Sequence, residues 1–207
     1  MEYMTISIAI IIITCLISIT TLASNPGKID DLSMSPYMVQ RHKQYYRFLT
    51  SGLVHGSYMH LGFNMLTLFF FGRYIESAFE QLFHSKLYFL LFYVLGLVLS
   101  DIPSYLKHRN DSYYSSIGAS GAVSAVVFAF ILFEPWARIT VLVFPMPAIL
   151  YGVLYLGYTI YMSRSGQAPG IDHDAHLWGA VFGLLFPLIF EPRIGPLFLN
   201  QLLNHFN

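Results

Sequence analysis

Apolar residues gather in six long segments, which more polar connections separate. The segments cover residues 4–23, 53–72, 87–106, 113–133, 147–162 and 175–190. A helix needs about 20 predominantly apolar residues to cross the hydrocarbon core of a bilayer. The pattern therefore predicts an all-α integral membrane protein with six transmembrane helices in a single domain, residues 1–207. Residues 200–207, beyond the last segment, are expected to form a frayed tail.

The first and fifth segments each allow a second interpretation. The first could be a signal peptide, but the residues before it carry only Glu2 and no Lys or Arg, and its apolar run is long. A retained helix is therefore favoured. In the fifth, Pro147 suits the first turn of a helix, where the backbone N–H that proline lacks is unpaired in any case. Residues 139–146 are then expected to be a loop or an extended segment.

The longest connection, residues 24–52, has a pattern of its own. Ser35 followed by Pro36 is typical of a helix N-cap and first turn. The residues that follow mix basic and aromatic side chains: Arg41, Lys43, Tyr45, Tyr46, Arg47 and Phe48. This mixture favours an amphipathic segment at the membrane interface, and a plain solvated loop is the alternative.

Composition supports a membrane protein and narrows its partners. Hydrophobic residues make up 56% of the chain and charged residues 11%, whereas soluble domains carry about 25% charge. The formal net charge of zero gives no reason to expect a nucleic-acid partner. A single cysteine excludes an intrachain disulfide and a cysteine-rich metal site. The lipid bilayer is the expected surrounding, and no metal or organic cofactor is implied.

Polar residues recur near the starts of the second, fourth and sixth segments. His60 and Asn64 lie four residues apart in the second, so they share one helical face. Ser120 opens the fourth segment, and His176 opens the sixth. Because successive spans alternate in direction, these starts lie on one side of the membrane. Polar side chains inside membrane segments are costly and usually mark function, so we expect a site there.

Small residues beside these positions allow the helices to approach closely. Gly179 and Gly183 form a small-xxx-small pair in the sixth segment. Gly118 and Gly121 make the start of the fourth segment slim. Close approach of the fourth and sixth helices is what a hydrogen bond between Ser120 and a histidine of the sixth requires.

These residue types suit acyl transfer. A serine hydroxyl becomes a good nucleophile when a base takes its proton, and His176 is the candidate base for Ser120. The resulting oxyanion needs preorganised donors. The candidates are the Asn64 amide, the His60 imidazole and the Ser120 backbone N–H. The soluble-hydrolase pattern G-x-S-x-G does not fit, because Ala122 stands two residues after the serine.

The same residues in this order resemble the rhomboid family of intramembrane serine proteases. The motifs are Arg47-Phe-Leu-Thr-Ser51, His60-Leu-Gly-Phe-Asn64, Gly118-Ala-Ser120-Gly121 and Ala175-His176-Leu-Trp-Gly179. The resemblance implies a Ser120–His176 dyad without an acidic third member, with His60 and Asn64 at the oxyanion hole. It also implies a minimal six-helix fold, a fifth helix that acts as a lateral gate, and transmembrane protein substrates cut at small residues.

Two positions depart from the family pattern. Many relatives have an aromatic residue four positions after the serine, where it packs against the histidine, and this chain has Ser124. Other aromatic residues, or a hydrogen bond from Ser124, would then hold His176. Trp178 replaces a commoner small residue beside His176, and it is expected to face lipid or a neighbouring helix.

Simpler interpretations exist for each candidate residue. Ser120 could be a packing serine, and His60 with Asn64 could merely bridge helices. His173 is a rival base one turn before His176, although Asp172-His173-Asp174 reads more simply as a solvated loop that could also bind a metal. His55 is expected at the membrane interface.

Three functions compete at this level. The leading hypothesis is an intramembrane serine endopeptidase. A proteolytically inactive rhomboid-like protein that binds transmembrane clients is the alternative, and the retained serine and histidine argue against it. A small-solute transporter ranks lower, because no inverted repeat is visible. The expected location is a bacterial cytoplasmic membrane.

The distribution of Lys and Arg favours a membrane orientation opposite to the one that the family resemblance implies. The site would face the non-cytoplasmic side, which then carries Lys28, Arg41, Lys43, Arg47, Lys107, Arg109 and Arg164. The cytoplasmic side carries only Arg73, Lys86, Arg138 and Arg193. The positive-inside rule favours the reverse. Because four of the seven lie in the 24–52 connection, which is predicted to be an interfacial structure, the family orientation is retained.

Overall fold

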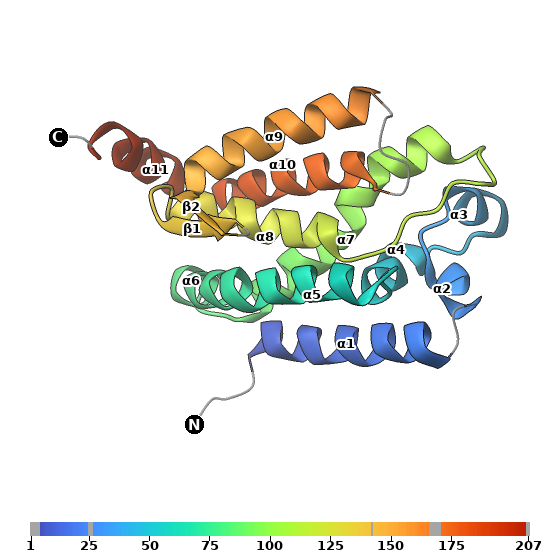
Figure 1. Ribbon diagram of the computed structural model, residues 1–207. Helices are drawn as coiled ribbons and strands as arrows, with labels where there is room; N and C mark the ends of the chain where they lie inside the picture. Colours follow the sequence, from blue (N-terminus) through green and yellow to red (C-terminus); the bar gives the residue numbers. More distant parts are fainter. Residues whose placement is uncertain (1–4, 25–26, 142, 166–170, 206–207) are drawn as a thin grey trace.

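The computed structural model describes residues 5–24, 27–141, 143–165 and 171–205, and helices dominate it (Figure 1). The elements in chain order are α1 (Ile6–Ser24), α2 (Gly27–Leu32), α3 (Pro36–His42), α4 (Arg47–Thr50), the 3-10 turn η1 (Ser51–Leu53), α5 (Tyr58–Thr67), the π-helical turn η2 (Leu68–Gly72), α6 (Arg73–Phe83), α7 (Leu87–His108), α8 (Ser120–Phe133), β1 (Arg138–Val141), β2 (Phe144–Pro147), α9 (Ala148–Ser165), α10 (His173–Phe190) and α11 (Ile194–Leu203).

Three helices in the described part of the chain are long and apolar enough to cross a membrane. They are α1, α7 and α10, and they correspond to the first, third and sixth predicted segments, with α1 beginning at Ile6. The second segment corresponds to the helical run from α5 through η2 to α6, which continues to Phe83. The fourth corresponds to α8, which starts at Ser120 rather than at residue 113. Residues 113–119 instead form the loop that enters α8.

The residues before α9 include two short strands, in line with the loop or extended segment expected there. Strands β1 and β2 pair antiparallel, with Ile139 opposite Met146. Pro147 is the last residue of β2, and α9 begins at the next residue, so the predicted helix start was early by one position.

The connection between α1 and α5 is a packed structure rather than a solvated loop. The Ser35 side chain caps α3 by accepting a hydrogen bond from the Met38 N–H, and Pro36 opens the helix, as predicted. Arg47 is buried, and its Nη1 donates to the backbone oxygens of Asp30 at 2.8 Å and Ser33 at 2.7 Å. A buried guanidinium satisfied in this way fixes α4 against the segment that contains α2.

Helix α8 lies at the centre of the bundle, and nearly all its residues from Gly121 to Leu132 are buried. Helix α10 packs against it without intervening side chains. A Cβ added at Gly179 would lie 2.1 Å from the Gly121 carbonyl oxygen, and one at Gly183 would lie 2.2 Å from that of Ala125. The two backbones are therefore in direct contact along this seam.

Helix α11 corrects the expectation for the end of the chain. Residues 200–203, predicted to be frayed, belong to α11, whereas residues 206 and 207 lie outside the described residues. Gln201 holds the helix to the bundle. Its side-chain Nε2 donates to the backbone oxygen of Phe133, and its backbone oxygen accepts from Trp136 Nε1. Helix α11 is apolar but only 10 residues long, so a search for segments long enough to cross a membrane passed over it.

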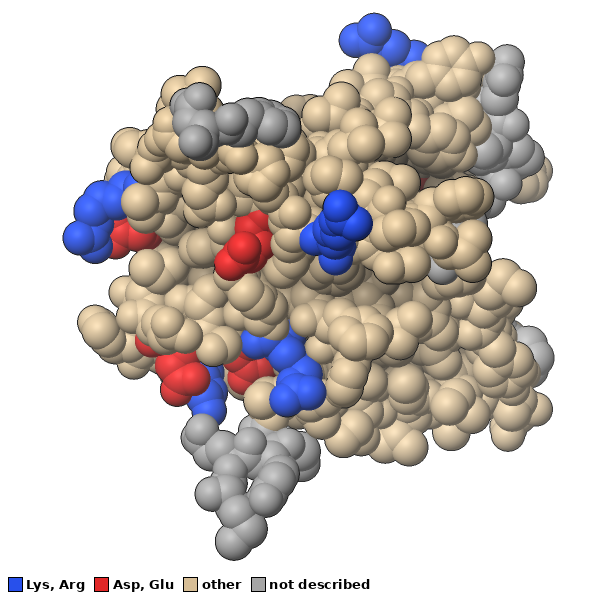
Figure 2. Space-filling model, turned by 60° about the vertical axis from the view of Figure 1, so that its left-hand side comes forward, with Lys and Arg blue, Asp and Glu red and all other residues tan. Residues whose placement is uncertain are grey.

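Much of the outer surface is apolar. Large exposed hydrophobic side chains cover α1 and α9 in particular: Ile12, Ile13, Leu16, Ile19, Leu150, Val153, Leu154, Tyr158 and Tyr161. Figure 2 views the end of the molecule that carries α6 and the β-hairpin, and its Lys, Arg, Asp and Glu side chains form small, separate groups. A largely uncharged exterior of this kind suits contact with lipid.

Candidate active site

Ser120 and His176 meet where α8 and α10 begin. Ser120 is the first residue of α8, and His176 lies in the first turn of α10. The His176 Nε2 atom lies 2.7 Å from the Ser120 Oγ atom. That distance is within the range through which an imidazole can take a hydroxyl proton.

The loop before α8 places the serine by means of Gly118. Its φ of 109° lies in a region that side chains rarely adopt, and a Cβ there would come within 2.6 Å of the His60 ring. The Gly118 N–H donates to Ser51 O at 2.9 Å. Gly118 is therefore a turn residue just before the helix, and its lack of a side chain leaves room for the His60 ring of α5. Gly121 does lie in a helix contact, since its Cβ would meet Ser100 Oγ at 2.2 Å.

Asn64 brings an unused donor to the serine. It is 6% exposed, and its Nδ2 has no hydrogen-bond partner among the described residues. A cavity of about 150 Å³ beside it is also lined by Ser120 and His176. Leaving a buried amide unpaired costs roughly 1–3 kcal/mol, so such a group in a cavity suits a ligand that it can bind.

His60 lies close to the serine loop but does not line that cavity. Ser57 caps α5 by accepting from the His60 N–H at 3.1 Å, which fixes the start of the helix. The His60 ring packs edge-on against His55, with ring centroids 4.9 Å apart. His60 and Asn64 thus flank Ser120 from one helix, with only Asn64 facing the cavity.

His55 is fully buried within the protein. Ser18 of α1 donates its hydroxyl proton to Leu53 O at 2.8 Å and lies 2.9 Å from His55 Nδ1. Because that proton is used, His55 Nδ1 is the donor to Ser18 Oγ. Ser18, His55 and His60 therefore form a chain of contacts from α1 to the site. Helical periodicity missed His55 because it precedes α5.

An aromatic ring from another helix replaces the one missing at Ser124. Tyr155 of α9 stacks on His176, with ring centroids 6.2 Å apart and planes 18° apart. The Ser124 Oγ atom lies 2.5 Å from the Tyr155 hydroxyl oxygen. Of the two predicted means of holding His176, the structure shows the aromatic one. Ser124 bonds Tyr155 rather than the histidine, and so it anchors the ring that covers His176. Trp178 faces outward, 47% exposed.

The acidic motif before His176 is packed rather than solvated, which corrects the simpler expectation. Asp172 caps α10, and its carboxylate accepts hydrogen bonds from the Ala175 N–H, Ser104 Oγ and Tyr114 OH. Burial and this carboxylate raise the pKa of the Tyr114 phenol, so it stays a donor. Asp174 pairs with Lys107 at 2.8 Å. The described residues contain no group of three or more His, Cys, Asp or Glu side chains placed to hold a metal ion.

His173 is close to His176 but does not replace it. It is 6% exposed, and its ring lies edge-on to those of Tyr158 and His176. Neither ring nitrogen has a hydrogen-bond partner among the described residues. The histidine bonded to Ser120 is His176.

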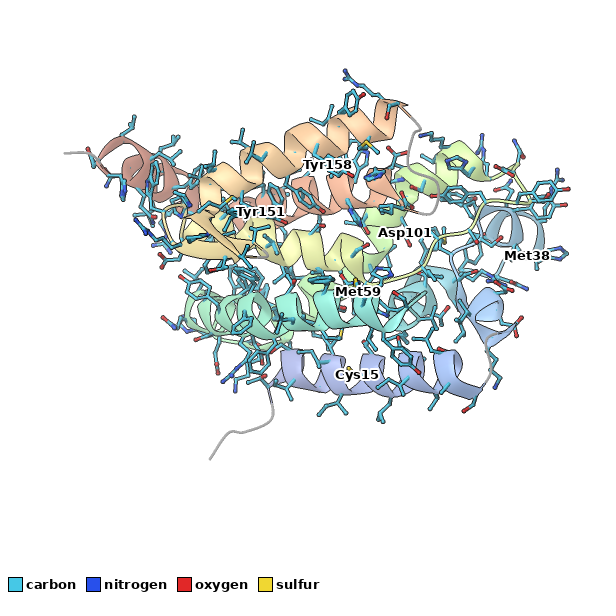
Figure 3. The ribbon with its side chains drawn as sticks, in the orientation of Figure 1. Cys15, Met38, Met59, Asp101, Tyr151 and Tyr158 are labelled. Atoms are coloured by element: carbon cyan, nitrogen blue, oxygen red, sulfur yellow. The ribbon has the colours of Figure 1, made fainter. Side chains whose placement is uncertain are left out.

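A very small polar cavity lies on the other side of Ser120. Its volume is about 10 Å³, and its polar lining includes Ser51, Ser100, Asp101 (labelled in Figure 3), Ser116 and Asp172. That volume is close to the minimum that holds one water molecule. The polar lining supplies hydrogen-bond partners for a water beside the serine.

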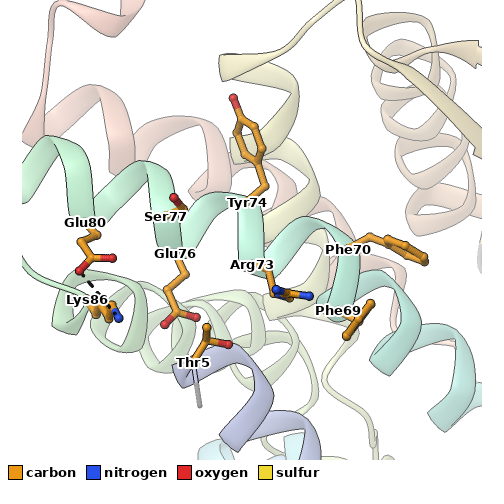
Figure 4. Close-up of a pocket in the computed structure, with 9 residues that line it drawn as sticks. All are labelled: Thr5, Phe69, Phe70, Arg73, Tyr74, Glu76, Ser77, Glu80 and Lys86. Carbon is orange, nitrogen blue, oxygen red and sulfur yellow. Dashed lines mark ion pairs between the residues drawn. The ribbon is translucent and has the colours of Figure 1, made fainter. Parts of the chain in front are cut away.

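Another cavity lies around α6, away from the dyad, and has a volume of about 500 Å³ (Figure 4). Its Glu76 carboxylate accepts hydrogen bonds from the N–H groups of Ile6 and Ser7 and from the Ser7 hydroxyl, which fixes the start of α1. Lys86 and Glu80 form an ion pair at 3.8 Å. This cavity shares no lining residue with the cavity beside Ser120 and His176. Its buried Glu76 carboxylate holds α1 against α6.

Comparison with known proteins identifies the family. Residues 42–193 match the Rhomboid domain. The chain belongs to the rhomboid family. As a rhomboid, it is an integral membrane protein with apolar helices, and members of the family are in general intramembrane serine proteases, although some are inactive.

Curated relatives match most of this chain. RHOMBOID-like protein 12, mitochondrial, from Arabidopsis thaliana is 32% identical over 149 residues, which are 64% of this chain and 42% of the relative. Presenilin-associated rhomboid-like protein, mitochondrial, from Homo sapiens is 32% identical over 142 residues, 67% of this chain and 36% of the relative. RHOMBOID-like protein 4 from Arabidopsis thaliana is 31% identical over 158 residues, 75% of this chain and 36% of the relative. The chain spans less than half the length of these relatives.

Proposed function

We propose that the protein is an intramembrane serine endopeptidase that cleaves transmembrane segments of membrane proteins. Ser120 is the nucleophile, and His176 is the general base. The observation that carries the proposal is the 2.7 Å contact between Ser120 Oγ and His176 Nε2 at the starts of two apolar helices. Membership of the rhomboid family adds support from an independent source.

The reaction follows from this contact. Ser120 Oγ attacks the carbonyl carbon of the scissile peptide bond while its proton moves to His176 Nε2. The tetrahedral intermediate breaks its C–N bond, and His176 gives the proton to the departing amine nitrogen. A water molecule then attacks the acyl carbon as His176 takes its proton. Breakage of the C–Oγ bond releases the carboxylic acid, and the proton on His176 returns to Ser120.

The oxyanion of each tetrahedral intermediate is bound by donors around Ser120. Asn64 Nδ2 is the foremost candidate, because it is buried and unpaired in the cavity shared with the dyad. The Ser120 N–H and the positive end of the α8 dipole add to the field, and His60 supplies a further donor. Removing one such donor typically lowers the rate about 10²–10³-fold.

The membrane arrangement belongs to the same proposal. A single domain with six spans is formed when the α5–α6 run, α8 and α9 cross the bilayer together with α1, α7 and α10. The dyad faces the non-cytoplasmic side, and α9 is the gate through which substrates with small residues at the cleavage site enter. A bacterial cytoplasmic membrane remains our prediction for the location, and two of the relatives described above carry mitochondrial names.

The experiment combines a covalent probe with a substrate. Detergent-solubilised protein is incubated with a fluorophosphonate and, separately, with a model transmembrane substrate. Labelling and cleavage by the wild type that both vanish in Ser120→Ala support the protease. Labelling or cleavage that persists in Ser120→Ala contradicts it, and a wild type that binds the substrate without either reaction favours the inactive client-binding alternative.

A further inference from the structure

The His176 ring has few contacts that fix its orientation. Its one described side-chain hydrogen bond is to Ser120, which reacts and therefore cannot hold the ring throughout the reaction. The nearby carboxylate of Asp172 is bonded to Ser104, Tyr114 and the Ala175 N–H. A base must keep its geometry to within fractions of an ångström, so another group must restrain the imidazole.

The Tyr155 ring supplies that restraint, and its own position is fixed. Its centroid lies 6.2 Å from that of His176 with nearly parallel planes, within the range of favourable offset stacking. Its hydroxyl lies 2.5 Å from Ser124 Oγ. Ser124 stands one helical turn after Ser120, so the nucleophile and the anchor share one face of α8.

Tyr155 belongs to a helix that is loosely attached to the bundle. Only Ala148, Gly152 and Thr159 of α9 are buried. Figure 3 labels Tyr151 and Tyr158, between which Tyr155 lies in the sequence. Among the described residues, the side chains of α9 make two hydrogen bonds to other helices, one from Tyr155 to Ser124 and one from Ser163 to Asp174.

The cavity beside Ser120 borders this helix. Its lining includes Phe63 and Thr67 of α5 on one side and Tyr151 and Tyr155 of α9 on the other. A peptide that enters between α5 and α9 to reach Ser120 must therefore pass the Tyr155 side chain. Movement of α9 away from α8 separates Tyr155 from both Ser124 and His176.

We propose that Tyr155 is a positioning residue for His176, and that its hydrogen bond to Ser124 couples the alignment of the base to the docking of α9. This inference rests on the proposed function. When α9 is docked, the ring restrains the imidazole toward Ser120. When α9 moves away, the base loses that restraint and the nucleophile is less active until α9 returns.

The test measures the base and the gate separately. The rate of labelling by a small fluorophosphonate reports the activation of Ser120, and kcat and KM are measured with a model transmembrane substrate. We expect Tyr155→Leu to lower the labelling rate and kcat about three- to tenfold with little change in KM, as the loss of an aromatic pair predicts. Ser124→Ala and Tyr155→Phe keep the ring but lose its anchor, and we expect about twofold reductions.

A matched control and a rescue variant make the test specific. Tyr161→Leu removes another tyrosine of α9 that is 61% exposed, and it is expected to label and cleave at the wild-type rate. The double variant Ser124→Tyr/Tyr155→Leu supplies a ring from α8 to the vacated space and is expected to recover the labelling rate. The melting temperature of each variant in detergent checks the fold.

Two results overturn the proposal while leaving the proposed function intact. One is an active wild type with Tyr155→Leu labelled and cleaving at the same rate. The other is an equal loss in Tyr155→Leu and Tyr161→Leu, because that result shows a general effect on α9. If Tyr155→Leu does not fold, the test depends on Tyr155→Phe and Ser124→Ala. Labelling of both variants at the wild-type rate overturns the proposed coupling between the alignment of His176 and the docking of α9. Failure of the proposed function is recognised separately, by a wild type whose labelling does not depend on Ser120.

Discussion

The seam between α8 and α10 and the contact between α8 and α9 place the same site in opposite ways. At the seam, glycines bring the two backbones into direct contact, which fixes the separation between the backbones that carry Ser120 and His176. At α9, two side-chain hydrogen bonds and a ring stack make the attachment. The two reacting side chains are thus carried by helices whose backbones are in direct contact. One wall of the cavity is carried by α9, which can separate from α8.

The largest expected effect tests which histidine of α10 acts as the base for Ser120 across the seam. His176→Ala should lower the cleavage rate at least about 10³-fold, because the base bonded to Ser120 is removed. His173→Ala should stay within about fivefold of the wild type, because neither of its ring nitrogens bonds a described residue. Both rates are measured with the same transmembrane substrate. Loss of cleavage in His173→Ala alone would reverse the assignment.

The second prediction concerns the wall of the cavity that α5 supplies. Asn64→Ala and Asn64→Asp both remove the amide donor, and the second keeps the side-chain shape. We expect kcat to fall about 10²–10³-fold in each, with KM nearly unchanged, because the donor acts on the transition state. Steady-state kinetics measure both constants. A change confined to KM would show that Asn64 binds the substrate and not the oxyanion.

The third prediction compares one glycine of the seam with one of α9. Gly179→Ala forces a Cβ to within 2.1 Å of a carbonyl oxygen, whereas Gly157 of α9 has no atom within 4 Å of its added Cβ. We expect Gly179→Ala to lower the free energy of unfolding by about 1–3 kcal/mol and the labelling rate about tenfold. Gly157→Ala should leave both equal to or slightly above the wild type, since alanine favours a helix.

Thermal unfolding in detergent and fluorophosphonate labelling measure the two quantities. Equal effects of the two substitutions would remove the contrast between the rigid seam and the loosely attached helix. A wild-type labelling rate in Gly179→Ala would show that the seam tolerates a separation of the two backbones.

The smallest expected effect comes from α1. Ser18→Ala removes the acceptor of His55 Nδ1, and the loss of one hydrogen bond of about 1 kcal/mol predicts a two- to fivefold lower kcat through His60. Thr20→Ala is the control, because that exposed hydroxyl bonds only the backbone of its own helix. Cleavage rates measured side by side compare them. Equal rates for the two variants would exclude α1 from the site.

Sequence patterns predicted those parts of the site that depend on periodicity. Ser120, His176, Asn64 and the glycines of α10 stand at helical spacings in apolar segments, where a polar or small residue is conspicuous. The same reasoning missed His55, because it lies in the turn before α5, where no period applies. It also could not select Tyr155, because Tyr151, Tyr155, Tyr158 and Tyr161 recur at similar spacing and the pattern does not say which of them faces α10.

Helix ends were predicted less well than helix centres. Residues 113–119 are apolar enough to continue a helix, but the positive φ of Gly118 and its hydrogen bond to Ser51 end the loop just before Ser120. Hydropathy does not record such a turn. The buried Arg47 and the packed Asp172 were likewise read as surface groups, because the carbonyls and hydroxyls that satisfy them come from distant segments.

The most direct measurement of the central claim is to map the fluorophosphonate adduct by mass spectrometry of peptides from the detergent-solubilised protein. The account predicts a single phosphonylated residue, Ser120, and a labelling rate that collapses in His176→Ala while His173→Ala retains it. An adduct on another residue, or a His176→Ala protein labelled at the wild-type rate, would contradict the proposal that these two side chains form the reacting pair.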